Sequence, residues 1–256
     1  MFEWFTSSVL YGEQSFERAC GEIAGLGLER VDLWQIPGWC EHLREGPAAV
    51  SRTLARHGLQ LEAISAFNQP LAATCELLPV LADLGGHALV MGSAKPDVSV
   101  NEFAGQIEPL VVQAERLGVT LAIENHNRAV IDSLNSMQQL VARLPSPGLS
   151  IALAPIHLHN IGESVPAAIR AMADRIGLFY VWDWGQTSVK NWKDPAEQFV
   201  GTGEIDYPPI FAALRASGYA RPLCVFAHGP EHWPPERTTA ELGAALARAR
   251  ALAAGA

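Results

Sequence analysis

The feature that most constrains this chain is an alternation of short apolar runs and amphipathic segments, repeated about every 30 residues. Eight runs rich in β-branched and aromatic residues predict strands, near residues 3–9, 29–35, 59–67, 87–92, 119–124, 149–154, 176–182 and 222–227. A segment with helical spacing of apolar residues follows each run. Eight strand–helix units in 256 residues fit a single (β/α)8 TIM barrel, and we expect one domain over residues 1–256. An open doubly wound sheet is disfavoured, because no glycine-rich phosphate-binding loop follows the first strand.

Residues typical of helix starts mark several of the predicted helices. Ser99 and Glu102 predict a capping box, in which each side chain accepts a hydrogen bond from the other residue's backbone N–H. Asp206 predicts an N-cap for the helix that precedes the eighth strand. Thr238 and Glu241 predict a second capping box at the start of the last helix.

Charge and hydropathy exclude several classes of partner. The chain has 18 Lys and Arg against 27 Asp and Glu, a net charge of −9, so we do not expect nucleic acid as a partner. The longest uncharged stretch, residues 144–162, is interrupted by prolines and histidines, so no membrane partner is expected. The four cysteines form no C-x-x-C pair, and the first residues lack a basic segment. We therefore expect reduced thiols and a cytoplasmic location.

The most informative ionisable residue is Glu124, at the end of the fifth predicted strand. Active sites of such barrels lie at the carboxyl ends of the strands. If Ala122 and Glu124 are the inward positions of their strand, the carboxylate points into the barrel mouth. A buried carboxylate needs a cation, a metal or a raised pKa, so we predict a catalytic role, with a structural salt bridge as the alternative.

Histidine and tryptophan gather at the same predicted rim. His157 follows the sixth strand and His228 follows the eighth, and we predict both as catalytic partners of Glu124. Tryptophan presents a flat apolar face and one N–H donor, which suits a sugar or a polyol. The predicted substrate-binding residues, which share this rim, are Trp34, Asn125, His126, His159, Tyr180, Trp182 and Asp183.

Three segments carry a resemblance to a known family. They read LAIENHN on the fifth strand, SIALAPIHLHNIGES on the sixth, and FVGTGEIDYPPIFAALRASGYARPL before the eighth. Over essentially its whole length the chain resembles the xylose isomerase-like barrels, which include sugar phosphate isomerases and epimerases and endonuclease IV. The stretch Gly201–Asp206 (GTGEID) is typical of the superfamily rather than of one substrate.

The resemblance implies a divalent metal held by Glu, Asp, His and Glu on strands five to eight. Glu124 matches the first of these ligands, whereas the other positions read Ala154, Tyr180 and Phe226. We therefore expect the usual metal to be lost, with a rearranged Mn or Zn site as the alternative. That alternative site would use Glu124, His157, Asp183 and His228.

The resemblance favours a sugar or keto-polyol isomerase or epimerase that transfers a proton next to a carbonyl, with a small-molecule carbohydrate as its partner. One alternative is a non-catalytic, regulatory sugar-binding protein on a decayed scaffold, and another is a lyase or dehydratase on the same barrel. Endonuclease activity is not expected, because residues 66–68 and 91–93 lack the histidine ligands of that branch. The long connection 183–205 predicts either a lid or the contact of a homodimer.

Overall fold

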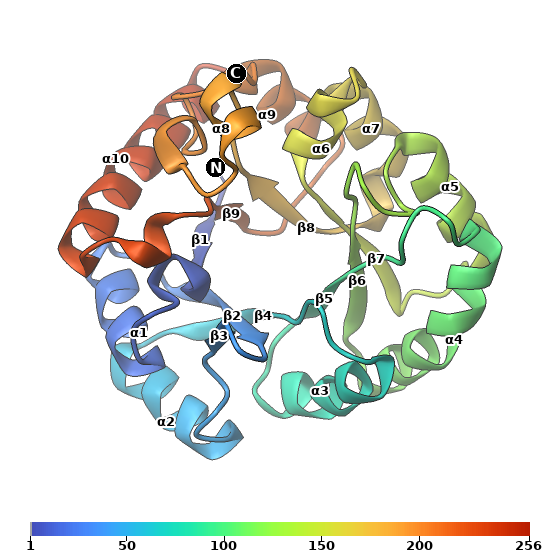
Figure 1. The fold of residues 1–256 in the computed structure, drawn as a ribbon, viewed down its shortest axis with the longest axis horizontal. Coiled ribbons are helices and arrows are strands. Elements are labelled where there is room, and N and C mark those ends of the chain that lie inside the picture. The colour runs from blue at the N-terminus through green and yellow to red at the C-terminus, as the bar shows by residue number, and fades with distance from the viewer. Residues whose placement is uncertain (1) are drawn as a thin grey trace.

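The computed structural model describes residues 2–256, and within them nine strands form one sheet. The strands are β1 (Trp4–Ser7), β2 (Arg30–Ile36), β3 (Cys40–Glu41), β4 (Gln60–Ser65), β5 (Ala88–Gly92), β6 (Thr120–Glu124), β7 (Leu149–Leu153), β8 (Ile176–Val181) and β9 (Leu223–Val225). All but β3 pair in parallel with their neighbours along the chain, and β9 pairs again with β1 (Figure 1). This closure confirms the predicted (β/α)8 barrel. The short β3 is an antiparallel extension of β2 that the sequence did not predict.

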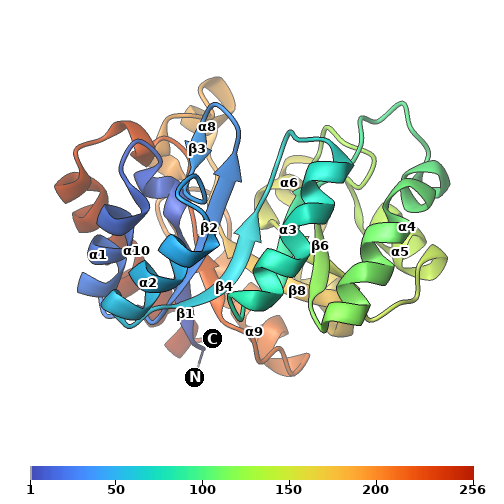
Figure 2. The same ribbon diagram turned by 90° about the horizontal axis from the view of Figure 1, so that it is seen from below.

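Helices form a ring around the barrel (Figure 1). They are α1 (Phe16–Gly25), α2 (Pro47–His57), α3 (Leu71–Asp83), α4 (Val100–Leu117), α5 (Leu134–Arg143), α6 (Pro155–Asn160), α7 (Val165–Met172), α8 (Gln186–Lys190), α9 (Tyr207–Ala216) and α10 (Pro235–Ala254). In α4, the buried residues recur at helical spacing and include Phe103, Ile107, Leu110 and Ala114. Figure 2 shows β3 and α8 at one end of the barrel and both ends of the chain at the other.

The predicted capping box of α4 is confirmed. Glu102 N donates to Ser99 Oγ at 3.2 Å, and Ser99 N donates to Glu102 Oε2 at 2.9 Å. Asp206 occupies the N-cap position of α9 as predicted, but its side chain makes no capping hydrogen bond within residues 2–256. The residues whose N–H groups such a cap would bind are Pro208 and Pro209, which have none.

The predicted capping box of the last helix is wrong. Helix α10 begins at Pro235, three residues before Thr238, because a proline suits the first turn of a helix. The Thr238 hydroxyl donates instead to the carbonyl of Pro230, at 3.0 Å.

Among the helices of residues 2–256, including α10, none is long and apolar enough to cross a lipid bilayer.

Candidate functional site

Glu124 lies where the sequence places it, at the carboxyl end of β6 and inside the barrel. Its side chain is buried, with the whole residue 8% exposed. Burial raises the pKa of this carboxyl to about 8, and the nearby Asp32 adds to the shift. At neutral pH both the acid and the carboxylate are therefore populated, so Glu124 can exchange a proton.

His157 is the nearest ionisable partner of Glu124. It lies on α6, a six-residue helix that starts at Pro155, shortly after the end of β7. His157 Nε2 lies 3.9 Å from Glu124 Oε1, and the His157 ring centroid lies 4.1 Å from that of His126. Burial holds the pKa of His157 well below its usual value, with His126 adding to the shift. The ring is therefore neutral and offers one N–H donor and one acceptor beside the carboxyl.

Asp32 is a second buried carboxylate that sequence reasoning missed. Its Oδ2 accepts hydrogen bonds from Trp34 Nε1 at 2.8 Å and from the Ser65 hydroxyl at 3.0 Å. Burial raises the pKa of Asp32 to about 7. Asp32 and Trp34 are two residues apart on β2 and share one face of the strand. The alternation that points Glu124 into the barrel could have found Asp32 if it had been applied to β2.

Several buried polar atoms in this region have no hydrogen-bond partner anywhere in residues 2–256. They are Asp32 Oδ1, the Tyr180 hydroxyl and both ring nitrogens of His157. Buried polar groups in folded proteins are nearly always paired with protein, water or ligand. Their concentration near Glu124 is the property expected of a site that binds a hydroxylated molecule.

His228 follows β9 and lies within a cage of aromatic rings. Its ring centroid is between 4.9 and 5.7 Å from those of the surrounding side chains, which are Trp34, Trp39, Trp182, Trp192 and Phe226. Burial lowers the pKa of His228 to about 3, so the ring stays neutral. The Trp182 ring centroid lies 5.7 Å from that of His157. Trp182 thus links the cage to the Glu124 cluster, by which we mean Glu124, Asp32, His126, His157 and Tyr180.

Asp183, predicted as a substrate-binding residue, organises the connection 184–205. Its carboxylate accepts four backbone N–H bonds of 2.8–3.1 Å, from Trp184, Gly201, Gly203 and Ile205. A Cβ at Gly203 would lie 2.5 Å from Asp183 Oδ1, so this close approach requires glycine. The glycines of the GTGEID stretch thus serve Asp183, and its oxygens are already occupied.

Gln198 is a further residue that the sequence did not reveal, because its role depends on three separate segments. Its Oε1 accepts from Trp182 Nε1 and from the backbone N–H of His228, both at 2.9 Å. Its Nε2 donates to the carbonyls of Trp192 and Asp194. Gln198 therefore holds the connection 184–205 against the aromatic cage.

Two predicted substrate-binding residues have other surroundings. Asn125 is fully buried and exchanges two hydrogen bonds with the backbone of Ala154, at 2.7 and 3.1 Å, which joins the ends of β6 and β7. His159 lies two residues beyond His157 on α6, about 200° around the helix axis, and is half-buried. The structure thus groups His126, Tyr180, Trp182 and Trp34 around Glu124 and His228, and leaves Asn125 and His159 outside that group.

The residues at the implied metal positions do not fit a divalent ion. Glu124 supplies one carboxylate, Ala154 and Phe226 supply no donor, and burial holds the pKa of the Tyr180 phenol well above its usual value. In the part of the chain that the structure describes, no three His, Cys, Asp or Glu side chains are grouped to hold a metal ion. The residues of the alternative, rearranged metal site are not brought together either; these are Glu124, His157, Asp183 and His228.

Comparison with known proteins gives a family model and more distant relatives. A model of the xylose isomerase-like TIM barrel matches residues 41–249. An L-ribulose 3-epimerase of Mesorhizobium japonicum is 34% identical over 141 residues, which are 54% of this chain and 43% of that protein. The match therefore spans less than half of that relative's length.

Solved structures share the fold at lower identity. A structure of an L-ribulose 3-epimerase has a TM-score of 0.74 at 20% identity, and the match covers 98% of this chain and 96% of that chain. The IOLI protein, solved with a bound zinc atom, has a TM-score of 0.79 at 15% identity, covering 98% of this chain and 99% of that chain. Identities this low concern the fold alone.

Proposed function

The chain belongs to the xylose isomerase-like TIM barrel family, and on that premise we propose that it isomerises or epimerises a sugar or keto-polyol by proton transfer next to a carbonyl. The observation that carries the proposal is the buried pair at the barrel mouth. Glu124 has a pKa raised to about 8, and His157 Nε2 lies 3.9 Å from its carboxylate. One group can take a proton and the other can donate a hydrogen bond.

These two residues account for the removal of the proton. The Glu124 carboxylate takes the proton from the carbon next to the carbonyl, and the electron pair of that C–H bond moves toward the carbonyl oxygen. The neutral His157 donates its N–H to the negative charge that develops on this oxygen. Glu124 gives the isomer when it returns the proton to the neighbouring carbon and the hydroxyl proton passes between the two oxygens. The epimer forms when water protonates the opposite face of the same carbon and Glu124 releases its proton to solvent.

A ketose is the substrate class that the relatives favour, because an L-ribulose 3-epimerase matches part of this chain at 34% identity. The aromatic faces of Trp34 and Trp182 suit the apolar faces of a sugar, and the unpaired Tyr180 hydroxyl and Asp32 Oδ1 suit its hydroxyl groups. A lyase would begin with the same proton abstraction and would then expel a leaving group from the adjacent carbon.

A sugar-binding protein without catalysis is the second candidate. The observation that favours it is Phe226, which stands at the position of an implied metal ligand. Its ring packs instead against Trp34, Trp182 and His228, at centroid distances of 4.9–5.7 Å. Such a protein would be stabilised against heat by its ligand and would yield no product.

The test is turnover of a panel of ketopentoses and ketohexoses, including L-ribulose, with products separated by chromatography. Replacing Glu124 with Gln keeps the shape of the side chain and removes its base, so we expect a loss of about 10²–10⁴-fold in kcat. The exposed Glu241→Gln is the matched control and should retain full activity. Unchanged turnover in Glu124→Gln would overturn the assignment, and an eliminated product would identify the lyase.

A further inference from the structure

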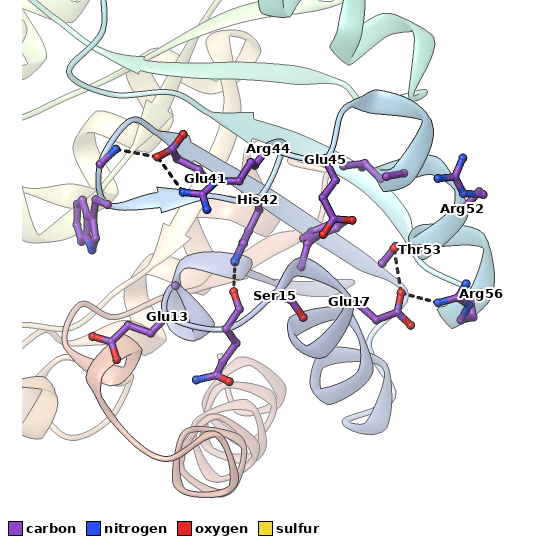
Figure 3. Close-up of a pocket in the computed structure, with 17 residues that line it drawn as sticks. Glu13, Ser15, Glu17, Glu41, His42, Arg44, Glu45, Arg52, Thr53 and Arg56 are labelled. Carbon is purple, nitrogen blue, oxygen red and sulfur yellow. Dashed lines mark hydrogen bonds and ion pairs between the residues drawn. The ribbon is translucent and has the colours of Figure 1, made fainter.

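A polar groove of about 600 Å³ opens beside the barrel mouth (Figure 3). Its walls come from the connection between β1 and α1, from the first turn of α1, from the turn and strand after β2, and from α2. Figure 3 shows Glu13 and Glu41 toward one end and Arg52 and Arg56 at the other. None of its lining residues belongs to the Glu124 cluster, so the groove is a separate feature that still needs an explanation.

Trp39 connects this groove to the candidate site. It lines the groove, and its ring also stacks on His228 with a centroid distance of 5.7 Å and an angle of 27°. Trp39 also meets Trp192, at a centroid distance of 6.5 Å. A molecule bound at the mouth could therefore extend over the rim into the groove along one aromatic side chain.

The charges in the groove largely neutralise one another. Arg56 Nη1 lies 2.8 Å from Glu17 Oε2, which also accepts from the Thr53 hydroxyl at 3.0 Å. Arg44 Nη2 lies 3.5 Å from Glu41 Oε1 in a second pair. A phosphate or a peptide carboxylate needs an excess of one charge, which this lining does not offer.

The same lining suits hydroxyl groups, which are donors and acceptors at once. The lining contains both arginine donors and glutamate acceptors, so the hydroxyl groups of a neutral sugar can find either kind of partner. His42 contributes no charge, because burial lowers its pKa, and its ring nitrogens lie within hydrogen-bond distance of Ser8 and Gln14. An aromatic face beside hydrogen-bond donors and acceptors suits a saccharide, which has apolar faces and hydroxyl groups.

We infer that the groove is a second saccharide subsite, and that the preferred substrate of the barrel is a ketose that forms part of a neutral glycoside of at least two rings. The inference rests on the proposed function and specifies its substrate class. One ring would occupy the mouth beside Glu124, and the next would pass Trp39 into the groove. Binding energy from the second ring would position the reacting carbon, so truncation to one ring should lower kcat as well as raise KM.

The binding test uses ligand-observed saturation-transfer NMR with neutral disaccharides that contain a free ketose (lactulose, maltulose, palatinose and turanose), compared with D-fructose and L-ribulose. We expect at least one disaccharide to bind about tenfold more tightly than either monosaccharide, with transfer to both rings. The double variant Glu45→Ala/Arg52→Ala changes exposed groove residues outside the catalytic cluster. It should remove most of this advantage and leave monosaccharide binding unchanged.

Ser51→Ala is the matched control, because Ser51 is exposed on α2 but does not line the groove. Equal affinity for one-ring and two-ring sugars, or an undiminished advantage in the double variant, would overturn the inference. So would displacement of a bound disaccharide by inorganic phosphate, since the groove would then select charge.

The binding and turnover results separate the two proposals. If ketoses are turned over but no disaccharide gains affinity, the subsite is wrong and the proposed function stands. If a disaccharide binds in the groove but neither it nor any ketose of the panel is converted, the subsite stands and the catalytic assignment is wrong.

Discussion

Two buried carboxylates, Asp32 and Glu124, give the barrel mouth its chemical character. Glu124 could be predicted because it ends an apolar strand, where the alternation of side chains leaves few orientations. Asp32 lies in the middle of β2 and could have been found by the same alternation. The pKa values of about 7 and 8 could not be predicted, because they depend on burial by residues from other strands.

The raised pKa of Glu124 predicts a pH-dependent stability difference. The folded protein holds this proton with a pKa of about 8 against a reference of 4.5, so the wild type loses stability as the pH rises from about 4.5 to 8. Glu124→Gln cannot ionise and should gain in Tm relative to wild type over that interval, by several degrees at about 2–4 °C per kcal/mol. Calorimetry at pH 5 and pH 9 measures the difference. A Tm difference that is the same at both values would contradict the raised pKa.

Asp32→Asn should shift the pH profile of turnover. Asn can still accept the hydrogen bonds of Trp34 and Ser65, but it removes a negative charge that contributes to the raised pKa of Glu124. Because activity requires ionised Glu124, the rising limb of kcat/KM, expected near pH 8, should move to lower pH. The shift should be modest, since burial is the larger cause of the raised pKa. An unmoved limb would mean that Asp32 does not act on Glu124.

At the scale of elements, the connection 184–205 shows what pattern reasoning could and could not predict. The length of the connection 183–205 predicted a lid or a homodimer contact, and both remain predictions. The structure adds that Asp183 and Gln198 tie it to the barrel through residues up to 30 positions apart. Such ties involve backbone N–H groups, which carry no sequence pattern of their own. The sequence also did not predict α6, because its six residues are too few to show a helical spacing of apolar side chains.

Asp183→Asn should loosen this connection. An amide keeps one oxygen acceptor and places an NH₂ group against backbone N–H donors, so at least two of the four bonds are lost. Trypsin cleavage at the exposed Lys190 and Lys193 should become several-fold faster than in wild type. Asp206→Asn is the control, because the Asp206 side chain does not cap its helix. Equal cleavage rates in Asp183→Asn and wild type would show that the connection is held by other contacts.

At the scale of the whole molecule, the repeat of strand and helix was sufficient to predict the closed barrel. The aromatic cage was only partly predictable. Trp34 lies in β2 and Trp39 follows it, Trp182 follows β8, and His228 follows β9. The pairing of β8 with β9, of β9 with β1 and of β1 with β2 brings them together. The groove depends in the same way on the packing of α1 against α2, which the sequence does not specify.

The most direct test of Glu124 as the base is incorporation of solvent deuterium into a ketose, followed by NMR in D₂O with a chelator present. We expect deuterium at the carbon next to the carbonyl with wild type, none with Glu124→Gln, and no dependence on added Mn²⁺ or Zn²⁺. Exchange that appears only after a divalent metal is added, or that survives in Glu124→Gln, would contradict these expectations.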